Sequence, residues 1–294
     1  MDSVPNRAYR IKDSGRSSST PSSLGGYPVM GVIADRGVSQ ILRLFDARGQ
    51  RDLVGKMITP MGMRSRKLLR ALQNEAKIGQ RLDHPNLLKV IRLQAGGSRP
   101  YLIMEYCDGT SVDLMTPEVF AEVDLKQVLL SVTDCMAYVH SEGIIHRDIK
   151  PTHLMVSPPT DVRLIDFSVA REVTGKWWLL GRQRDRTAGT PEYMAPEQTL
   201  GNDQDPRTDI YGLGVTMFTL LTGRKPFMGE DLSRLMEQHR SAKPPRPRDV
   251  NRRIRVWVED LILAMMAKHP EDRPASMEDV ADTMRSNGPL FTDG

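Results

Sequence analysis

Hydrophobic positions divide the chain into an amino-terminal part with short alternating runs and a carboxy-terminal part with helical spacing. From Tyr27 to Tyr106, turn residues separate five runs, which read PVMGVIAD, SQILRLFDA, DLVGKMIT, LLKVIRLQA and RPYLIMEY. Runs of this length, rich in β-branched and aromatic residues and bounded by turn residues, are typical of β-strands. We therefore expect five strands in this part.

One amphipathic helix is predicted among these strands, from about Ser65 to Leu82, because leucine, alanine and isoleucine recur there at helical spacing. After Gly109 the helical pattern dominates, and between Leu125 and Val139 apolar residues recur at intervals of three and four. Further apolar helices are predicted at about residues 209–221, 256–268 and 277–284. The sequence thus predicts an α+β protein of two lobes, a small mainly β lobe with one helix and a larger mainly α lobe.

The predicted lobes form one domain over residues 27–286, flanked by two polar ends. Residues 1–26 are rich in serine and glycine and carry few apolar side chains, so we expect a disordered arm. The small lobe is predicted over 27–106, the larger lobe over 107–286, and a flexible tail over 287–294.

Composition narrows the functional classes only a little. The 41 Lys and Arg residues against 37 Asp and Glu residues give a net charge of +4, which is too diffuse to indicate nucleic-acid binding. Cys107 and Cys135 do not make a disulfide framework, so we expect a reducing cytoplasm. No apolar run is long enough to predict a membrane segment. The oligomeric state stays open.

Two aspartates stand out between Gly143 and Phe167, in the stretch GIIHRDIKPTHLMVSPPTDVRLIDF. Asp148 follows a helical pattern and Asp166 ends a short strand, so both carboxylates are predicted at element ends, where they can reach a ligand. The order His146, Arg147, Asp148, with Lys150 two residues later and then Asp166 and Phe167, resembles the catalytic loop and metal-binding loop of protein kinases.

The resemblance implies a role for each charged residue in phosphoryl transfer. Lys56 matches the strand lysine that holds the α- and β-phosphates of ATP, and Glu75 matches its partner on the helix. Asp148 matches the base that accepts the substrate hydroxyl proton, and Lys150 the charge that steadies the transferring phosphoryl group. Asp166 matches the main magnesium ligand.

Supporting motifs extend the resemblance along the chain. Glu197, in Ala-Pro-Glu, matches the end of the activation segment, and Arg273 its buried partner; Asp209 matches the helix residue that braces the catalytic loop. Gly-Thr-Pro-Glu-Tyr, which contains Thr190, is similar to serine/threonine kinases rather than tyrosine kinases. The segments HPNLLKV, DIYGLGV and RPASM resemble the bacterial, eukaryotic-like (Hanks-type) serine/threonine kinases.

The resemblance also implies a nucleotide site and a regulated segment. The expected ATP-binding residues are Ile33, Ala34, Arg36, Ser39, Ile41, Val54, Lys56, Met104, Glu105, Cys107 and Met155. Thr187 is the first expected phosphorylation site, because it lies three residues before Thr190, and Thr174 is the second. Arg147 would bind the added phosphate.

The sequence departs from the kinase pattern at the phosphate-binding loop. Ala34, Arg36 and Ser39 stand where the family has three glycines, which let backbone N–H groups approach the phosphates. Two interpretations follow. Arg36 could itself reach a phosphate, or the loop is a plain hairpin.

A second departure concerns the metal. His153 replaces the asparagine that holds the second magnesium in the family, and imidazole suits softer metals better than magnesium. Ser168 replaces a glycine after Phe167. Val54 replaces a small alanine beside adenine, and Gly79 replaces an apolar residue, which predicts altered nucleotide affinity and a loosely held helix.

The resemblance therefore supports a serine/threonine protein kinase that uses ATP and magnesium, or manganese, and acts on protein substrates. Two alternatives remain. The chain could be a pseudokinase, a nucleotide-binding or scaffolding module with weak or no phosphotransfer, because of the lost glycines and His153. Small-molecule phosphotransferases of related fold keep comparable aspartates but lack the Ala-Pro-Glu segment and its arginine.

Overall fold

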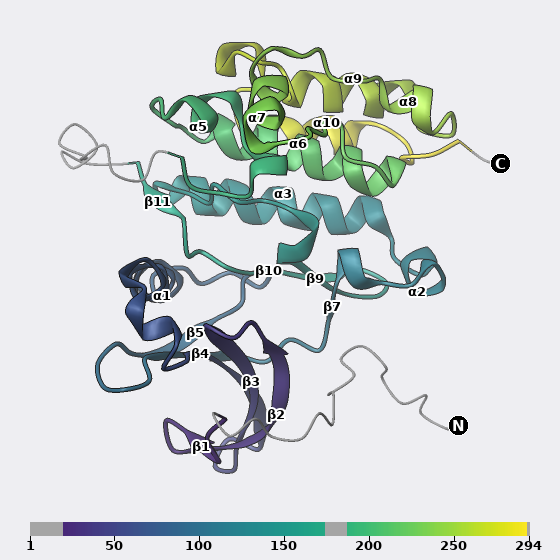
Figure 1. The fold of residues 1–294 in the computed structure, drawn as a ribbon. Helices are drawn as coiled ribbons and strands as arrows, with labels where there is room; N and C mark the ends of the chain where they lie inside the picture. Colours follow the sequence, from purple (N-terminus) through teal and green to yellow (C-terminus); the bar gives the residue numbers. More distant parts are fainter. Residues whose placement is uncertain (1–19, 174–186, 293–294) are drawn as a thin grey trace, which may run out of the picture. The chain divides into compact units, whose positions relative to one another are not determined.

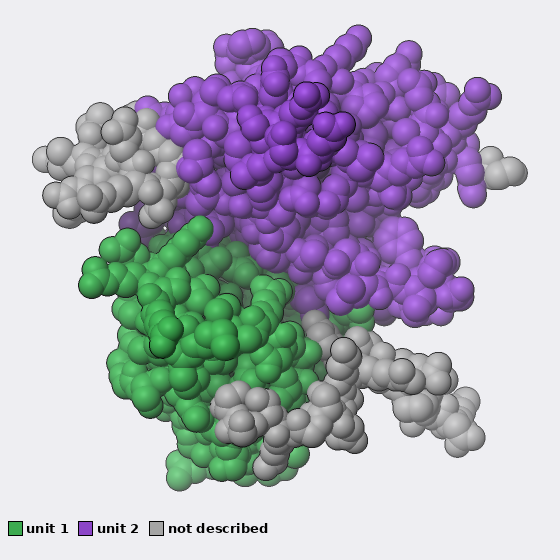
Figure 2. Space-filling model, viewed as in Figure 1, with its two compact units in different colours: residues 1–110, 163–168 green, residues 111–162, 169–294 purple. Residues whose placement is uncertain are grey.

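The computed structural model describes residues 20–173 and 187–292, which fall into two compact units. Unit 1 contains the chain up to residue 110 together with residues 163–168, and unit 2 contains residues 111–162 and 169–294 (Figure 2). Figure 1 labels most of their helices and strands. Thr174 lies outside the described residues, as does the predicted arm up to residue 19.

Unit 1 is built on a six-stranded antiparallel sheet in the order β1-β2-β3-β4-β6-β5. The strands are β1 (Ser23–Leu24), β2 (Tyr27–Asp35), β3 (Ser39–Asp46), β4 (Arg51–Ile58), β5 (Val90–Gln94) and β6 (Tyr101–Glu105). Strands β2 to β6 confirm the five predicted strands.

Strand β1 corrects the predicted arm. Ser23 and Leu24 pair with the start of β2, and Leu24 is buried in an apolar cluster with Leu44 and Leu53. A disordered arm reaching residue 26 is therefore wrong for residues 20–26, because one buried leucine ties this segment to the sheet.

The helix α1 (Arg66–Gly79) packs on β5 and follows the 3₁₀ turn η1 (Gly62–Arg64). Its N-cap is Ser65, whose hydroxyl accepts a hydrogen bond from the Leu68 N–H group. At its last residue a Cβ on Gly79 would lie 2.5 Å from Val90 Cγ2. The missing side chain at 79 therefore lets the end of α1 pack closely on β5. The loosely held helix stays a prediction.

Unit 2 is mainly helical. Its α-helices are α2 (Pro117–Ala121), α3 (Leu125–Ser141), α5 (Pro196–Leu200), α6 (Arg207–Thr222), α7 (Leu232–Ser241), α8 (Pro247–Val250), α9 (Val256–Met265) and α10 (Met277–Ser286). Helix α3 packs on α10, and α6 packs on α9. Most of α6 is buried, as expected for a helix that is apolar on all sides. The predicted long helices are confirmed.

Short elements connect these helices. The 3₁₀ turns are η2 (Val112–Leu114), η3 (Pro151–His153), η4 (Pro191–Tyr193) and η5 (Pro270–Asp272). The remaining strands are β7 (Thr110–Ser111), β8 (Ile144–Ile145), β9 (Leu154–Ser157), β10 (Asp161–Leu164) and β11 (Arg171–Glu172), of which β11 pairs with β8.

The carboxy-terminal segment is packed rather than flexible as far as residue 292. Leu290 is buried, and its carbonyl oxygen accepts a hydrogen bond of 3.0 Å from the Arg255 N–H group. Phe291 forms an antiparallel bridge with Ile254. The predicted tail is therefore wrong for residues 287–292. Within the described ranges, no helix has the length and apolar character to span a bilayer.

Candidate active site

In unit 1 a lysine and two carboxylates meet. Lys56 Nζ, on β4, lies 2.6 Å from Glu75 Oε2, on α1, and 3.4 Å from Asp166 Oδ2. The side chain of Glu75 is almost wholly buried, whereas those of Lys56 and Asp166 keep about a quarter of their surface exposed. The predicted pairing of Lys56 with Glu75 is present.

Burial and charge set the protonation of this cluster. Burial raises the pKa of Glu75 to about 7, against the opposing effect of the Lys56 charge. For Lys56, burial alone would lower the pKa, but the Glu75 and Asp166 carboxylates raise it above its ordinary value. Lys56 is therefore firmly cationic, as a group that binds phosphate oxygens must be.

Asp166 lies at a sharp backbone turn that is held by an asparagine. Its φ of 71° is in the left-handed region, and its Oδ1 accepts the Ser168 N–H group at 3.1 Å. Asn74, on α1 next to Glu75, donates from Nδ2 to the carbonyl oxygens of Phe167 and Ser168, both at 3.2 Å. Asn74 thus ties α1 to the Asp166 loop. Sequence reasoning missed it, although its position next to Glu75 was a usable signal.

In unit 2 the carboxylate of Asp148 is held on both oxygens. Lys150 Nζ donates to Asp148 Oδ2 at 2.7 Å, and the Thr190 N–H group donates to Asp148 Oδ1 at 2.7 Å. Lys150 Nζ also donates to Thr190 Oγ1. The predicted base Asp148, the predicted cation Lys150 and Thr190 are therefore in direct contact.

These contacts keep Asp148 ionised. Burial by itself would raise its pKa, but His153 when its ring is protonated, the Lys150 charge, and the hydrogen bonds from Lys150 and Thr190 hold the pKa below its ordinary value. Asp148 is thus a carboxylate at neutral pH, able to orient a hydroxyl group and to accept its proton.

His153 is buried beside the same loop. Its Nδ1 lies 2.9 Å from the Asp148 carbonyl oxygen, and because a carbonyl only accepts, Nδ1 carries the hydrogen. In the neutral ring the lone pair is then on Nε2, the arrangement that is usual for a metal-binding histidine. Among residues 20–173 and 187–292, no three His, Cys, Asp or Glu side chains form a metal-binding group by themselves.

The catalytic loop is braced by Asp209, as the resemblance implied. Its carboxylate accepts the N–H groups of His146 and Arg147, each at 2.7 Å, and lies 2.9 Å from His140 Nε2. Burial would raise the pKa of Asp209, but the hydrogen bond and charge of His140 and the other donors lower it. Arg147 has a φ of 70°, a conformation that these hydrogen bonds stabilise.

The side chain of Arg147 is buried and held within unit 2. Its Nε donates to Gln204 Oε1 at 2.7 Å, and its Nη1 donates to the Val169 carbonyl oxygen at 3.2 Å. Gln204 was not predicted, and a lone glutamine 57 residues away gives no local signal. Thr187 is exposed.

Glu197 and Arg273 form the predicted buried pair. Arg273 Nη1 and Nη2 donate to Glu197 Oε1 and Oε2 at 2.8 and 2.9 Å. This two-point geometry fixes α5, and with it the end of the activation segment, within unit 2.

The comparisons with known proteins agree with this geometry. The model of the protein kinase domain matches residues 31–284. The chain belongs to the protein kinase family. It is 35% identical over 215 residues to "Serine/threonine-protein kinase Pkn1" of Myxococcus xanthus, covering 72% of this chain and 31% of that protein. It is 31% identical over 265 residues to "Probable serine/threonine-protein kinase PknB" of Corynebacterium glutamicum, covering 87% of this chain and 41% of that protein.

A third relative is "Serine/threonine-protein kinase PknB" of Mycobacterium tuberculosis, 30% identical over 269 residues, with 86% of this chain and 42% of that protein covered. The kinase domain described here therefore spans about a third to two fifths of the length of these relatives. These matches confirm the predicted resemblance to bacterial serine/threonine kinases and the predicted two-lobed α+β fold.

Several of the predicted nucleotide-binding residues of the kinase domain gather in unit 1. Val54 and Met104 are buried in one apolar cluster, against which Ile33 and Ile41 pack. Glu105 ends β6, with its N–H group bonded to the Lys89 carbonyl oxygen. Cys107 follows in the same unit, whereas Met155 is buried in β9.

The glycine-poor loop is a hairpin closed by its own side chains. Asp35 Oδ1 accepts the Gly37 N–H group and Oδ2 accepts Gln40 Nε2, both at 2.8 Å. Ala34 pairs with Ile41 across β2 and β3, and the Arg36 N–H group donates to the Ser39 carbonyl oxygen. These bonds form a closed hairpin in which the Gly37 N–H group is already used within the turn. Whether the Arg36 side chain reaches a phosphate stays a prediction.

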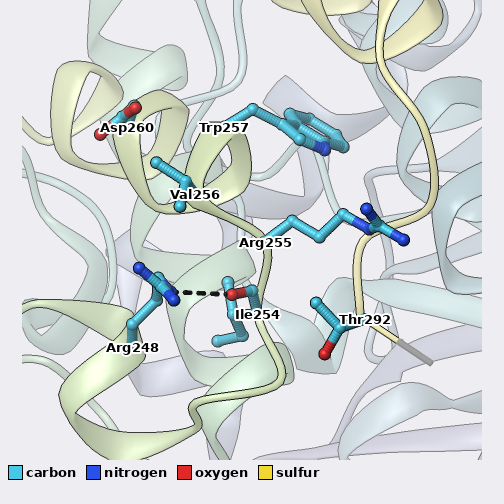
Figure 3. Close-up of a pocket in the computed structure, with 7 residues that line it drawn as sticks. All are labelled: Arg248, Ile254, Arg255, Val256, Trp257, Asp260 and Thr292. Carbon is cyan, nitrogen blue, oxygen red and sulfur yellow. Dashed lines mark hydrogen bonds between the residues drawn. The ribbon is translucent and has the colours of Figure 1, made fainter. Parts of the chain in front are cut away.

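A pocket in unit 2 lies apart from the predicted site residues. It has a volume of about 490 Å³ and is formed around α8, α9 and the carboxy-terminal segment (Figure 3). Its lining residues are Arg248, Ile254, Arg255, Val256, Trp257, Asp260 and Thr292. None of the residues predicted for catalysis or nucleotide binding contributes to it.

Proposed function

We propose that this kinase domain transfers the γ-phosphate of ATP to serine and threonine hydroxyl groups of proteins. The observation that carries the proposal is the state of Asp148, which is ionised and held on both oxygens by Lys150 and Thr190. A base fixed in this way orients the acceptor hydroxyl and takes its proton. Lys150 would balance the negative charge of the phosphoryl group as it moves.

The cluster of Lys56, Glu75 and Asp166 supports the nucleotide half of the proposal. Lys56 would bind phosphate oxygens while Glu75 holds its ammonium group in place. Asp166 offers carboxylate oxygens, the ligands that magnesium prefers. A divalent ion bound there would neutralise charge on the phosphates. His153, in unit 2, would offer an imidazole nitrogen to a second ion, and imidazole suits manganese better than magnesium.

The remaining parts of the proposal concern regulation and compartment. Phosphorylation of Thr187, or of Thr174, would control activity through the activation segment. A reducing cytoplasm is part of the proposal because the two cysteines of the sequence, Cys107 and Cys135, make no disulfide framework.

The test is incubation with labelled ATP, a serine- and threonine-containing protein acceptor, and magnesium or manganese. We expect label on serine and threonine for the unmodified protein and none for Asp148→Asn. Equal labelling of the two proteins in both metals would defeat the proposal and favour a pseudokinase. Thermal melting with millimolar ATP and metal tests the nucleotide half separately: a bound ligand raises the melting temperature, and Lys56→Met should abolish the rise.

A further inference from the structure

One buried glutamine in unit 2 joins three backbone segments. Gln198, on α5, has 1% of its surface exposed. Its Nε2 donates to the carbonyl oxygens of Arg147 and Ala188, both at 2.9 Å. Its Oε1 accepts the Ala195 N–H group, also at 2.9 Å. Both N–H donors of the amide are thus engaged, and its oxygen accepts one hydrogen bond.

The segments joined by Gln198 are those that carry the proposed chemistry. Arg147 precedes the base Asp148, and Ala188 lies two residues before Thr190. Gly189, which lies between Ala188 and Thr190, has a φ of 133°. A Cβ at this position would lie 2.7 Å from the Arg147 carbonyl oxygen. The activation segment therefore runs directly against the catalytic loop at this point, and glycine is required for the approach.

We propose that Gln198 is a positioning residue that holds the activation segment at the distance from the catalytic loop at which Thr190 can bind Asp148. Gln198 fixes Ala188 against Arg147, and two residues later the Thr190 N–H group donates to Asp148 Oδ1 at 2.7 Å. Its neighbour Glu197 has a different task, because it anchors α5 to Arg273. An effect of Gln198 on kcat rests on the proposed kinase activity, whereas the hydrogen bonds between Gln198 and the two segments do not.

The test compares Gln198→Met with Gln238→Met. Methionine has a similar length and shape but cannot donate to the two carbonyl groups. Gln238 is a less buried control whose amide also binds backbone: Nε2 donates to the Met228 carbonyl oxygen at 2.7 Å, and Oε1 accepts the Met228 N–H group at 3.2 Å. Both variants lose an amide that ties down backbone in unit 2, but only one of them loses contact with the catalytic loop.

The first readout is hydrogen exchange of the segment 187–195, which needs no activity. Loss of the Gln198 bonds should speed exchange of the Thr190 amide by at least about tenfold, since local opening replaces a held conformation. Gln238→Met should leave this segment unchanged. Exchange in Gln198→Met equal to that of the unmodified protein would overturn the inference, whether or not the protein transfers phosphate.

The second readout is steady-state kinetics. We expect kcat for a protein acceptor to fall by at least about tenfold in Gln198→Met, with KM for ATP within about twofold, because a mispositioned base affects the transition state more than nucleotide binding. A fall in kcat that Gln238→Met reproduces would indicate general loosening and overturn the inference. If Gln198→Met does not fold, Gln198→Glu keeps the acceptor for Ala195 and loses both donors when ionised, and the same exchange result is required of it. An inactive unmodified protein would refute the proposed function, and hydrogen exchange would still decide the role of Gln198.

Discussion

Replacing Glu197 by glutamine should destabilise the kinase domain far more than the same change at Glu192. All five N–H groups of Arg273 have acceptors: the two oxygens of Glu197 and the carbonyl oxygens of Ala267, Arg207 and Lys268. The side chain of Arg273 is 0% exposed and that of Glu197 is 7% exposed. In Glu197→Gln the buried guanidinium loses its counter-charge, and an amide N–H₂ group faces one of its donors.

The expected loss follows from that geometry. Breaking a buried ion pair by removing one partner costs about 3–5 kcal/mol, because the remaining charge stays out of water. At about 2–4 °C per kcal/mol for a domain of this size class, the melting temperature should fall by roughly 6–20 °C. Glu192 lies 3.0 Å from Lys225, but these side chains are 33% and 39% exposed, so Glu192→Gln should cost no more than about 1 kcal/mol.

The assay is urea unfolding of the two variants and the unmodified protein, followed by circular dichroism, with melting temperatures as a second measure. The two variants remove the same charge from carboxylates five residues apart, so their difference isolates the effect of burial. A difference in the free energy of unfolding below about 1 kcal/mol would refute the reasoning and show that water reaches the guanidinium of Arg273.

Three further predictions concern histidine chemistry and regulation. Replacing His153 by asparagine should raise kcat with magnesium by at least about tenfold, because an amide oxygen suits magnesium better than imidazole does, and manganese should partly rescue the unmodified protein; equal kcat for both proteins in both metals would exclude a metal role. Burial and the Lys268 charge lower the pKa of His239 to about 4 from 6.5, so the neutral ring contributes stability above pH 6.5 that is lost as the pH falls towards 4. Over that window the unmodified protein should lose up to roughly 3 kcal/mol more than His239→Gln, measured by urea unfolding at several pH values. After self-incubation with ATP, mass spectrometry should find phosphate on exposed Thr187, and phosphate confined to the amino-terminal serines would contradict this.

The sequence predicted those elements whose apolar residues recur with a regular period along the chain. Strands β2 to β6 and the long helices have clear periodicity, and the charged residues of the site lie in short motifs with fixed spacing. Strand β1 was missed because two residues with a single buried leucine do not change the composition of a serine-rich segment. The packed carboxy-terminal segment was missed for the same reason, since Leu290 and Phe291 bind residues that are some 35 positions away.

The amides that organise the site could not be predicted from local pattern. Asn74, Gln198 and Gln204 each have at least one partner 51 to 94 residues away, and an isolated amide in a sequence looks like an ordinary surface residue. Their role depends on burial, which only the folded chain reveals. The charge pairs Lys56 with Glu75 and Glu197 with Arg273 were predictable because the family pattern names both partners.

The close packing of Gly79 on Val90 has a consequence for how this domain can change in evolution. Because a Cβ at position 79 would lie only 2.5 Å from Val90 Cγ2, and valine is restricted to few rotamers, the two positions share one fixed volume. A methyl group added at position 79 therefore fits only if a methyl group is removed from the side chain at position 90. Natural variants with alanine at 79 should therefore carry a smaller residue than valine at 90, and the double change Gly79→Ala with Val90→Ala should recover stability that Gly79→Ala alone loses.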